Sequence, residues 1–199
     1  MAMTSSAMAP LGTKMPAFSL PDVVSGRTVT SDAMDPDKPV LVLFICAHCP
    51  FTRHIAPAVR LLSRSYHDKV NLVAISANDI TQVPEDSPEG LKRLAKELEW
   101  TAPFCYNESQ DVARAFGAAC SPECFLYDRS RTLVYRGEID ESRPGGGLKA
   151  LLAKAPSGAP VRAALDAVLN GARVDPNQRP GVGCNIKWRA AARAVAGQM

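Results

Sequence analysis

The strongest folding signal in the chain is an apolar run that leads directly into two cysteines and a proline. Residues 40–45 are Val-Leu-Val-Leu-Phe-Ile, the length and composition of a strand that is buried on both faces of a helix-covered sheet. Cys46 and Cys49 follow, and Pro50 stands where the first turn of a helix tolerates proline. Apolar residues then recur at helical spacing over residues 55–66. We therefore predict a strand, a cysteine pair and a helix in direct succession.

Strands and helices also alternate along the rest of the chain. Two short extended segments, 17–20 and 27–30, flank a Ser-Gly turn and predict a hairpin ahead of the main sheet. The later elements are predicted as strand 70–76, a helix from Ser87 to about residue 99, antiparallel strands 123–128 and 132–136, and helix 161–169. This order predicts one α/β domain, with a mixed central sheet, helices on both faces and an N-terminal β-hairpin extension.

The composition and the chain ends narrow the class of protein. The 199 residues include 23 basic and 20 acidic ones, and the net charge of +3 is spread along the chain, which argues against a nucleic-acid or membrane-surface partner. No apolar run is long enough to span a membrane, and residues 1–16 resemble neither a secretory signal nor a transit peptide. We expect a cytoplasmic protein with a flexible arm (1–14), a domain (15–172) and a tail that packs on it (173–199).

The cysteines are the candidate chemical groups. Six cysteines without a secretion signal favour catalysis, redox sensing or metal binding over a disulfide scaffold. Cys49 is expected at a helix N-terminus, where free N–H groups and the helix dipole favour the thiolate, so it is the candidate nucleophile. Cys46 forms a C-x-x-C pair with it, which could close a disulfide or bind a soft metal. His48 either lowers the pKa of Cys49 as an imidazolium or faces solvent.

Several motifs resemble a known family. Residues 15–20, the apolar strand and Cys46-Ala47-His48-Cys49-Pro50-Phe51 look like the alkyl hydroperoxide reductase/thiol-specific antioxidant branch of the thioredoxin superfamily. Within it, the chain is most similar to the peroxiredoxin-like 1 group. Further matching motifs are residues 86–90, 108–110, 117–122, 135–137 and 183–188. The resemblance covers about residues 12–190 and implies a thioredoxin fold, thiol chemistry and no organic cofactor.

The resemblance also suggests roles at the chemical centre. It places Cys49 at the nucleophilic cysteine of thioredoxins and Thr52 at their second cysteine. Cys46 stands where peroxiredoxins carry Thr, and Pro122 stands where they carry their active-site arginine. Pro122 instead matches the cis-proline of thioredoxins, which lies against the cysteine and presents backbone to an extended thiol substrate. Ser121 and Pro122 are therefore expected to form one wall of the site.

Four further cysteines have weaker assignments. Cys120 either resolves a Cys49 intermediate or is a buried spectator. Cys184, in the tail motif, either folds back to resolve that intermediate or packs. Cys105 and Cys124 lie in apolar contexts and are expected to fill the core.

The prediction is a thiol-disulfide oxidoreductase or peroxiredoxin-like thiol antioxidant. Cys49 attacks a disulfide or peroxide, and Cys46, or failing that Cys120, resolves the product. The expected substrate-binding residues are Ser121, Pro122, Thr52 and His48. Electrons would come from a reductant such as thioredoxin or glutathione. The alternative is a non-enzymatic module whose Cys46, His48 and Cys49 bind a metal or a partner protein, and a third is a peroxidase that lacks the usual arginine. Substrate, reductant and oligomeric state are left open.

Overall fold

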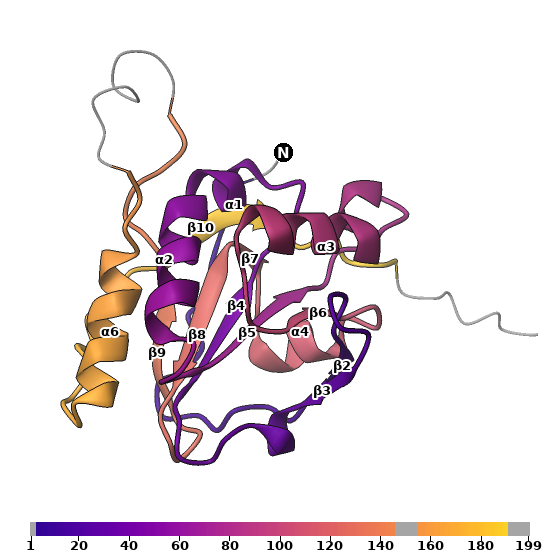
Figure 1. Cartoon of the computed structure of the whole chain (residues 1–199). Helices are drawn as coiled ribbons and strands as arrows, with labels where there is room; N and C mark the ends of the chain where they lie inside the picture. The colour runs from indigo at the N-terminus through magenta and orange to yellow at the C-terminus, as the bar shows by residue number, and fades with distance from the viewer. Residues whose placement is uncertain (1–2, 146–154, 191–199) are drawn as a thin grey trace, which may run out of the picture.

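A five-stranded mixed sheet forms the centre of the computed structural model, which describes residues 3–145 and 155–190 (Figure 1). The strands lie in the order β6-β5-β4-β8-β9. Their bounds are Phe104–Tyr106 (β6), Asn71–Ser76 (β5), Val40–Phe44 (β4), Glu123–Tyr127 (β8) and Leu133–Gly137 (β9). Strands β4, β5 and β6 are parallel, whereas β8 is antiparallel to both β4 and β9. The predicted mixed sheet is confirmed, and β6 is an additional edge strand that the sequence pattern did not reveal.

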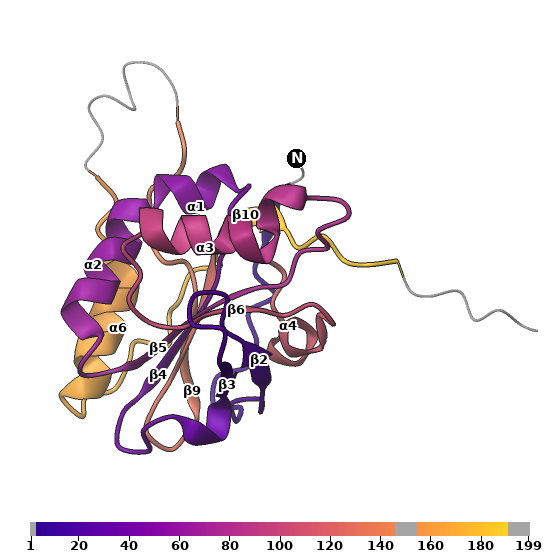
Figure 2. The ribbon, with the colours of Figure 1, turned by 45° about the vertical axis from the view of Figure 1, so that its right-hand side comes forward.

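Helices cover both faces of this sheet, as Figures 1 and 2 show together. Their bounds are Pro50–His54 (α1), Ala56–Tyr66 (α2), Pro88–Glu97 (α3), Asp111–Phe116 (α4) and Ala159–Leu169 (α6). On one face, α2, α3 and α6 pack against Leu41 and Leu43 of β4. On the other face, α4 and the hairpin of β2 (Ser19–Pro21) and β3 (Thr28–Thr30) pack against Phe44. This is the predicted thioredoxin fold with its N-terminal hairpin.

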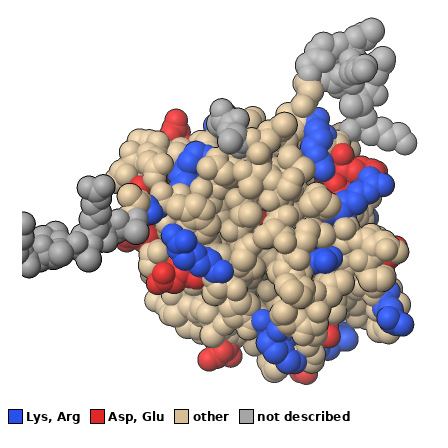
Figure 3. Space-filling view, turned by 180° about the vertical axis from the view of Figure 1, so that it is seen from behind, with Lys and Arg blue, Asp and Glu red and all other residues tan. Residues whose placement is uncertain are grey.

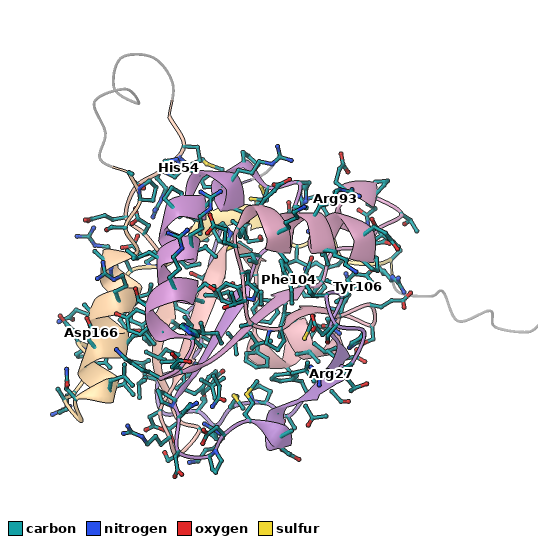
Figure 4. The ribbon with its side chains drawn as sticks, in the orientation of Figure 1. Arg27, His54, Arg93, Phe104, Tyr106 and Asp166 are labelled. Carbon is teal, nitrogen blue, oxygen red and sulfur yellow. The ribbon has the colours of Figure 1, made fainter. Side chains whose placement is uncertain are left out.

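The helix predicted from residue 50 to residue 66 is divided in two. The break lies at Ile55, whose φ of −83° and ψ of 6° are not helical. Pro57 follows in the first turn of α2 and has no N–H to donate to the carbonyl of Arg53, so the series of α-helical hydrogen bonds is interrupted. At the far end of α2, the Tyr66 hydroxyl donates to Asp166 Oδ1 over 2.7 Å and ties α2 to α6. Asp166 lies on α6, as Figure 4 shows.

A second, three-stranded sheet joins the two ends of the described chain. It has the order β1-β10-β7, with bounds Met3–Ser5 (β1), Val182–Asn185 (β10) and Cys120–Ser121 (β7). Both of its pairings are antiparallel. The flexible arm predicted for residues 1–14 is instead hydrogen-bonded over much of its described part, because β1 pairs with β10 and Gly12 donates to Leu133 O. Residues 1–2 and 191–199, at the ends of the predicted arm and tail, lie outside the described residues.

The charged side chains form no single-signed field on the face that Figure 3 shows. Lysines and arginines are scattered there among aspartates and glutamates, in keeping with the small net charge of +3. Within the described part of the chain, no helix has the length and apolar character needed to cross a membrane.

Candidate active site

The end of β4 and the start of α1 carry Cys46 and Cys49 into the interior. Cys49 is the N-cap residue of α1, with extended backbone (φ −81°, ψ 120°), and Pro50 opens the helix. The predicted position of Cys49 at a helix N-terminus is confirmed. Both side chains are buried, since Cys46 is 1% exposed and Cys49 is 0% exposed.

Three sulfur atoms meet at this point. Cys46, Cys49 and Cys184 form a separate buried cluster, against which Phe51 packs. Cys49 Sγ lies 3.0 Å from Cys184 Sγ, although the two residues are 135 positions apart in the sequence. The same Cys49 Sγ lies 3.0 Å from the carbonyl oxygen of Ser121, to which the protonated thiol donates a hydrogen bond.

The three thiols differ strongly in acidity. The hydrogen bond from the Cys46 thiol lowers the pKa of Cys49 to about 5; burial opposes this shift, and donors at Cys184 and the backbone N–H of Thr52 add to it. Burial raises the pKa of Cys46 well above that of a free thiol, and burial also raises the pKa of Cys184 to about 12. The cluster therefore favours one thiolate, at Cys49, with two protonated thiols donating to it.

Ser121 and Pro122 line the cluster on the β7 side. The peptide bond between them is cis, as the resemblance implied. Thr52, in α1, is fully buried, and its hydroxyl oxygen lies 3.4 Å from that of Ser121. The predicted residues Thr52, Ser121 and Cys49 thus meet in one place.

His48 does not face open solvent but is bound to a buried carboxylate. Its Nδ1 lies 2.6 Å from Asp86 Oδ2, its side chain is 10% exposed, and that of Asp86 is 0% exposed. Asp86 also accepts from the N–H of Ala47 at 2.6 Å and from Asn78 Nδ2 at 2.7 Å. Burial opposes ionisation of Asp86, but these hydrogen bonds, with that of His48 foremost, hold its pKa below the usual value. Asp86 thereby fixes the loop between Cys46 and Cys49.

No role was predicted for Asp86, although it opens one of the matching motifs. A lone aspartate before a helix is common at helix starts, and its contact with residues 39 positions away is a property of the fold. For Cys184, the sequence left two alternatives open: resolution of a Cys49 intermediate, or packing alone.

The remaining thiols lie apart from the sulfur cluster. Cys120 Sγ contacts Pro122 O and Glu123 Oε2, both at 3.9 Å, and burial together with the Glu123 carboxyl raises the pKa of Cys120. Cys105 and Cys124 belong to the hydrophobic cores on opposite faces of the sheet, as predicted. Of the two distant thiols, Cys184 and not Cys120 is therefore the one in contact with Cys49.

The space around the cluster is small. One cavity of about 10 Å³ is bordered by Cys46, Ser121 and Ile186, and another of the same size by Pro122 and Val182. Each has room for about one water molecule. The larger cavities of 630, 700 and 380 Å³ are lined by other parts of the molecule.

A cis-proline facing a buried cysteine at the start of a helix, on this sheet, defines a thioredoxin-like thiol protein. The AhpC/TSA family matches residues 11–136, and the chain belongs to this family. No curated protein matches the chain. Family membership supports a thiol-based redox role in general.

Similar solved structures agree with this assignment. An uncharacterized conserved protein from Geobacillus kaustophilus is 42% identical, covers 96% of this chain and 99% of its own, and has a TM-score of 0.87. A hypothetical protein from Sinorhizobium meliloti 1021 is 40% identical, with coverages of 94% and 100% and a TM-score of 0.87. The thioredoxin domain of a thiol-disulfide oxidoreductase from Bacteroides vulgatus shares the fold at 20% identity, with coverages of 68% and 90% and a TM-score of 0.53.

Proposed function

We propose that the protein is a thiol-dependent oxidoreductase of the peroxiredoxin-like 1 group, with Cys49 as its nucleophile. The observation that carries this proposal is the buried sulfur cluster, in which Cys184 Sγ lies 3.0 Å from Cys49 Sγ. The Cys46 and Cys184 thiols beside Cys49 lower its pKa to about 5. At neutral pH this group is a thiolate, which is the reactive form in attack on a disulfide or a peroxide.

Two substrate classes fit this nucleophile. With a disulfide, Cys49 attacks one sulfur, the S–S bond breaks, and the second sulfur leaves as a thiolate. With a peroxide, Cys49 attacks the distal oxygen, the O–O bond breaks, and Cys49 becomes a sulfenic acid while the leaving oxygen takes up a proton. Reduction by a thiol such as thioredoxin or glutathione, in a cytoplasmic setting, would return Cys49 to its starting form.

The surrounding residues have supporting roles in this proposal. Ser121 and Pro122 present the backbone wall against which a substrate sulfur or oxygen would lie, and the Thr52 hydroxyl lies beside the same wall. His48 holds the loop of the cysteine pair through Asp86. The main role of Cys46 is to favour the Cys49 thiolate by hydrogen bonding.

The decisive variant is Cys49→Ser. We expect it to abolish reduction of hydroxyethyl disulfide and of hydrogen peroxide, each measured with an excess of glutathione. The matched control is Cys105→Ala, which removes a buried thiol that lies in the hydrophobic core and outside the sulfur cluster, and which should retain the activity. Full activity in Cys49→Ser protein would refute the assignment of the nucleophile.

A metal-binding module is the second candidate, and one observation favours it. Ligand atoms of Cys46, His48 and Asp86 lie within 4.8 Å of one another, a set that contains Asp86 in place of the predicted Cys49. Thiolate, imidazole and carboxylate together suit Zn²⁺. Against this, the Asp86 oxygens already accept hydrogen bonds from Ala47 and Asn78, which a metal would displace. Stoichiometric zinc in protein purified under reducing conditions, lost in Asp86→Asn protein, would support this candidate over the enzyme.

A further inference from the structure

Cys184 occupies the position of a reaction partner for Cys49. A disulfide bond is about 2.05 Å long, and the two sulfur atoms are 3.0 Å apart, so bond formation needs an approach of about 1 Å. Both side chains are buried, with Cys49 0% and Cys184 2% exposed. An oxidised Cys49 would therefore meet this thiol before any thiol from solution.

The backbone around Cys184 is held in register with the cis-proline segment. Strand β10 pairs with β7 so that Cys184 is opposite Ser121, and it pairs with β1 on its other side so that Cys184 is opposite Met3. The neighbouring Gly183 permits this approach, because a Cβ at that position would lie 2.0 Å from the Ser121 carbonyl oxygen. Cys184 thus reaches Cys49 because its strand lies directly against the backbone wall of the site.

The chain beyond Cys184 is held by hydrogen bonds to both the N–H and the carbonyl group of Lys187. The N–H of Lys187 donates to Asn78 Oδ1 at 2.8 Å. The carbonyl oxygen of Lys187 accepts from Gln110 Nε2 at 2.8 Å and from the N–H of Asp79 at 2.9 Å. The Arg114 guanidinium lies over the Trp188 ring, with its Cζ atom 4.3 Å from the centre of the ring. We call residues 181–189 the tail strap, since they cross the sulfur cluster and are anchored beyond it.

We propose that Cys184 is the resolving residue, which forms an intramolecular disulfide with oxidised Cys49 beneath the tail strap. This inference rests on the proposed function and assigns a role that the sequence left open between Cys46, Cys120 and Cys184. The geometry favours Cys184 because its sulfur already lies 3.0 Å from that of Cys49, whereas the loop of Cys46 is held by Asp86.

The resolving step balances for both substrate classes. After a peroxide, Cys184 sulfur attacks the sulfenic sulfur of Cys49, the S–S bond forms, and hydroxide leaves with the Cys184 proton as water. After a disulfide, Cys184 attacks the Cys49 sulfur of the mixed disulfide, and the substrate thiolate leaves and takes up that proton. Two electrons are then returned by an external dithiol or by two monothiols, which reopen the Cys49–Cys184 bond.

The test maps the product of a single oxidation in the full-length protein. Reduced protein is mixed with one equivalent of hydrogen peroxide, or separately with hydroxyethyl disulfide, then alkylated and analysed by peptide mass spectrometry. We expect a Cys49–Cys184 linkage in wild-type and in Cys46→Ser protein. In Cys184→Ser protein we expect Cys49 to remain as a dimedone-reactive sulfenic acid or a mixed disulfide, with turnover at least about tenfold lower.

The outcomes separate this inference from the proposed function. If Cys49 stays reduced under both oxidants, the proposed function fails. If Cys49 is oxidised but its partner in the wild type is Cys46 or Cys120, or if Cys184→Ser protein turns over at the wild-type rate, only the role of Cys184 is refuted.

A variant that alters no thiol checks the placement of the tail strap. Gly183→Ala should slow formation of the Cys49–Cys184 linkage by about tenfold or more, because its Cβ pushes the strand from Ser121. The control is Gly145→Ala, where the nearest atom to the new Cβ is 3.9 Å away. Unchanged kinetics in folded Gly183→Ala protein, judged by circular dichroism, would contradict the proposed geometry.

Discussion

A thiolate that is buried away from water is costly unless hydrogen-bond donors surround it, and Cys49 has them. Donors at Cys46, Cys184 and the N–H of Thr52 lower its pKa against the opposing effect of burial. The type of residue was evident from the sequence, since Cys49 follows a strand and precedes Pro50. The hydrogen-bond donors were only partly evident. Cys184 lies 135 positions from Cys49 in the sequence, and no local pattern indicates which distant thiol contacts Cys49 in the fold.

This arrangement predicts the pH at which the thiolate forms. Because the pKa of Cys49 is lowered to about 5, ultraviolet absorbance of one thiolate should appear as the pH rises through that value, and remain at pH 7. Cys46→Ala removes the leading donor, so its titration should move to higher pH; Cys105→Ala should leave it in place. A wild-type titration near the free-thiol pKa of about 8.5 would contradict this account.

At the scale of elements, long patterns and local hairpins predicted the structure well, whereas short strands that pair with distant segments were missed. The apolar run of β4 and the spacing in α2 and α6 span enough residues to show a period, and these elements are confirmed. Strands β1, β7 and β10 have two to four residues each and exist because their backbones pair with distant segments. The break at Ile55 could have been predicted from the missing N–H of Pro57, since that donor is needed to continue the helix.

A close contact at the start of α3 gives a prediction that runs against helix propensity. Alanine normally stabilises a helix by about 1 kcal/mol relative to glycine. At Gly90, however, a Cβ would lie 1.9 Å from the carbonyl oxygen of Glu85, beside the turn that carries Asp86. We expect Gly90→Ala to lower the free energy of unfolding by about 1–3 kcal/mol in urea.

The matched control lies on the exposed side of the same helix. Lys92→Ala should change the free energy of unfolding by less than about 0.5 kcal/mol. A Gly90→Ala variant that is as stable as the wild type, or more stable, would show that the Glu85 carbonyl can move freely.

At the scale of the molecule, the candidate active site draws on three distant parts of the chain. Cys46 and Cys49 come from the β4–α1 junction, Ser121 from β7, and Cys184 from β10. The cluster therefore depends on the whole fold, and the pairing of β1 with β10 involves both ends of the described chain.

Oxidation should consequently change global stability. A Cys49–Cys184 bond would close a loop of 135 positions, and cross-links of such length raise the free energy of unfolding by up to about 5 kcal/mol. We expect calorimetry to show Tm at least about 5 °C higher for oxidised than for reduced protein. Cys184→Ser protein should show no such difference, and equal Tm values in wild-type protein with the bond mapped would count against a stabilising link.

The pairing of β1 with β10 also links an exposed strand to the strand that carries a buried sulfur. Met3 lies opposite Cys184 in the strand register, so a shift of Cys184 toward Cys49 would be transmitted through backbone hydrogen bonds to β1. Met3 is 73% exposed. A fluorophore attached to β1 would thus report at the surface a reaction between two buried sulfur atoms.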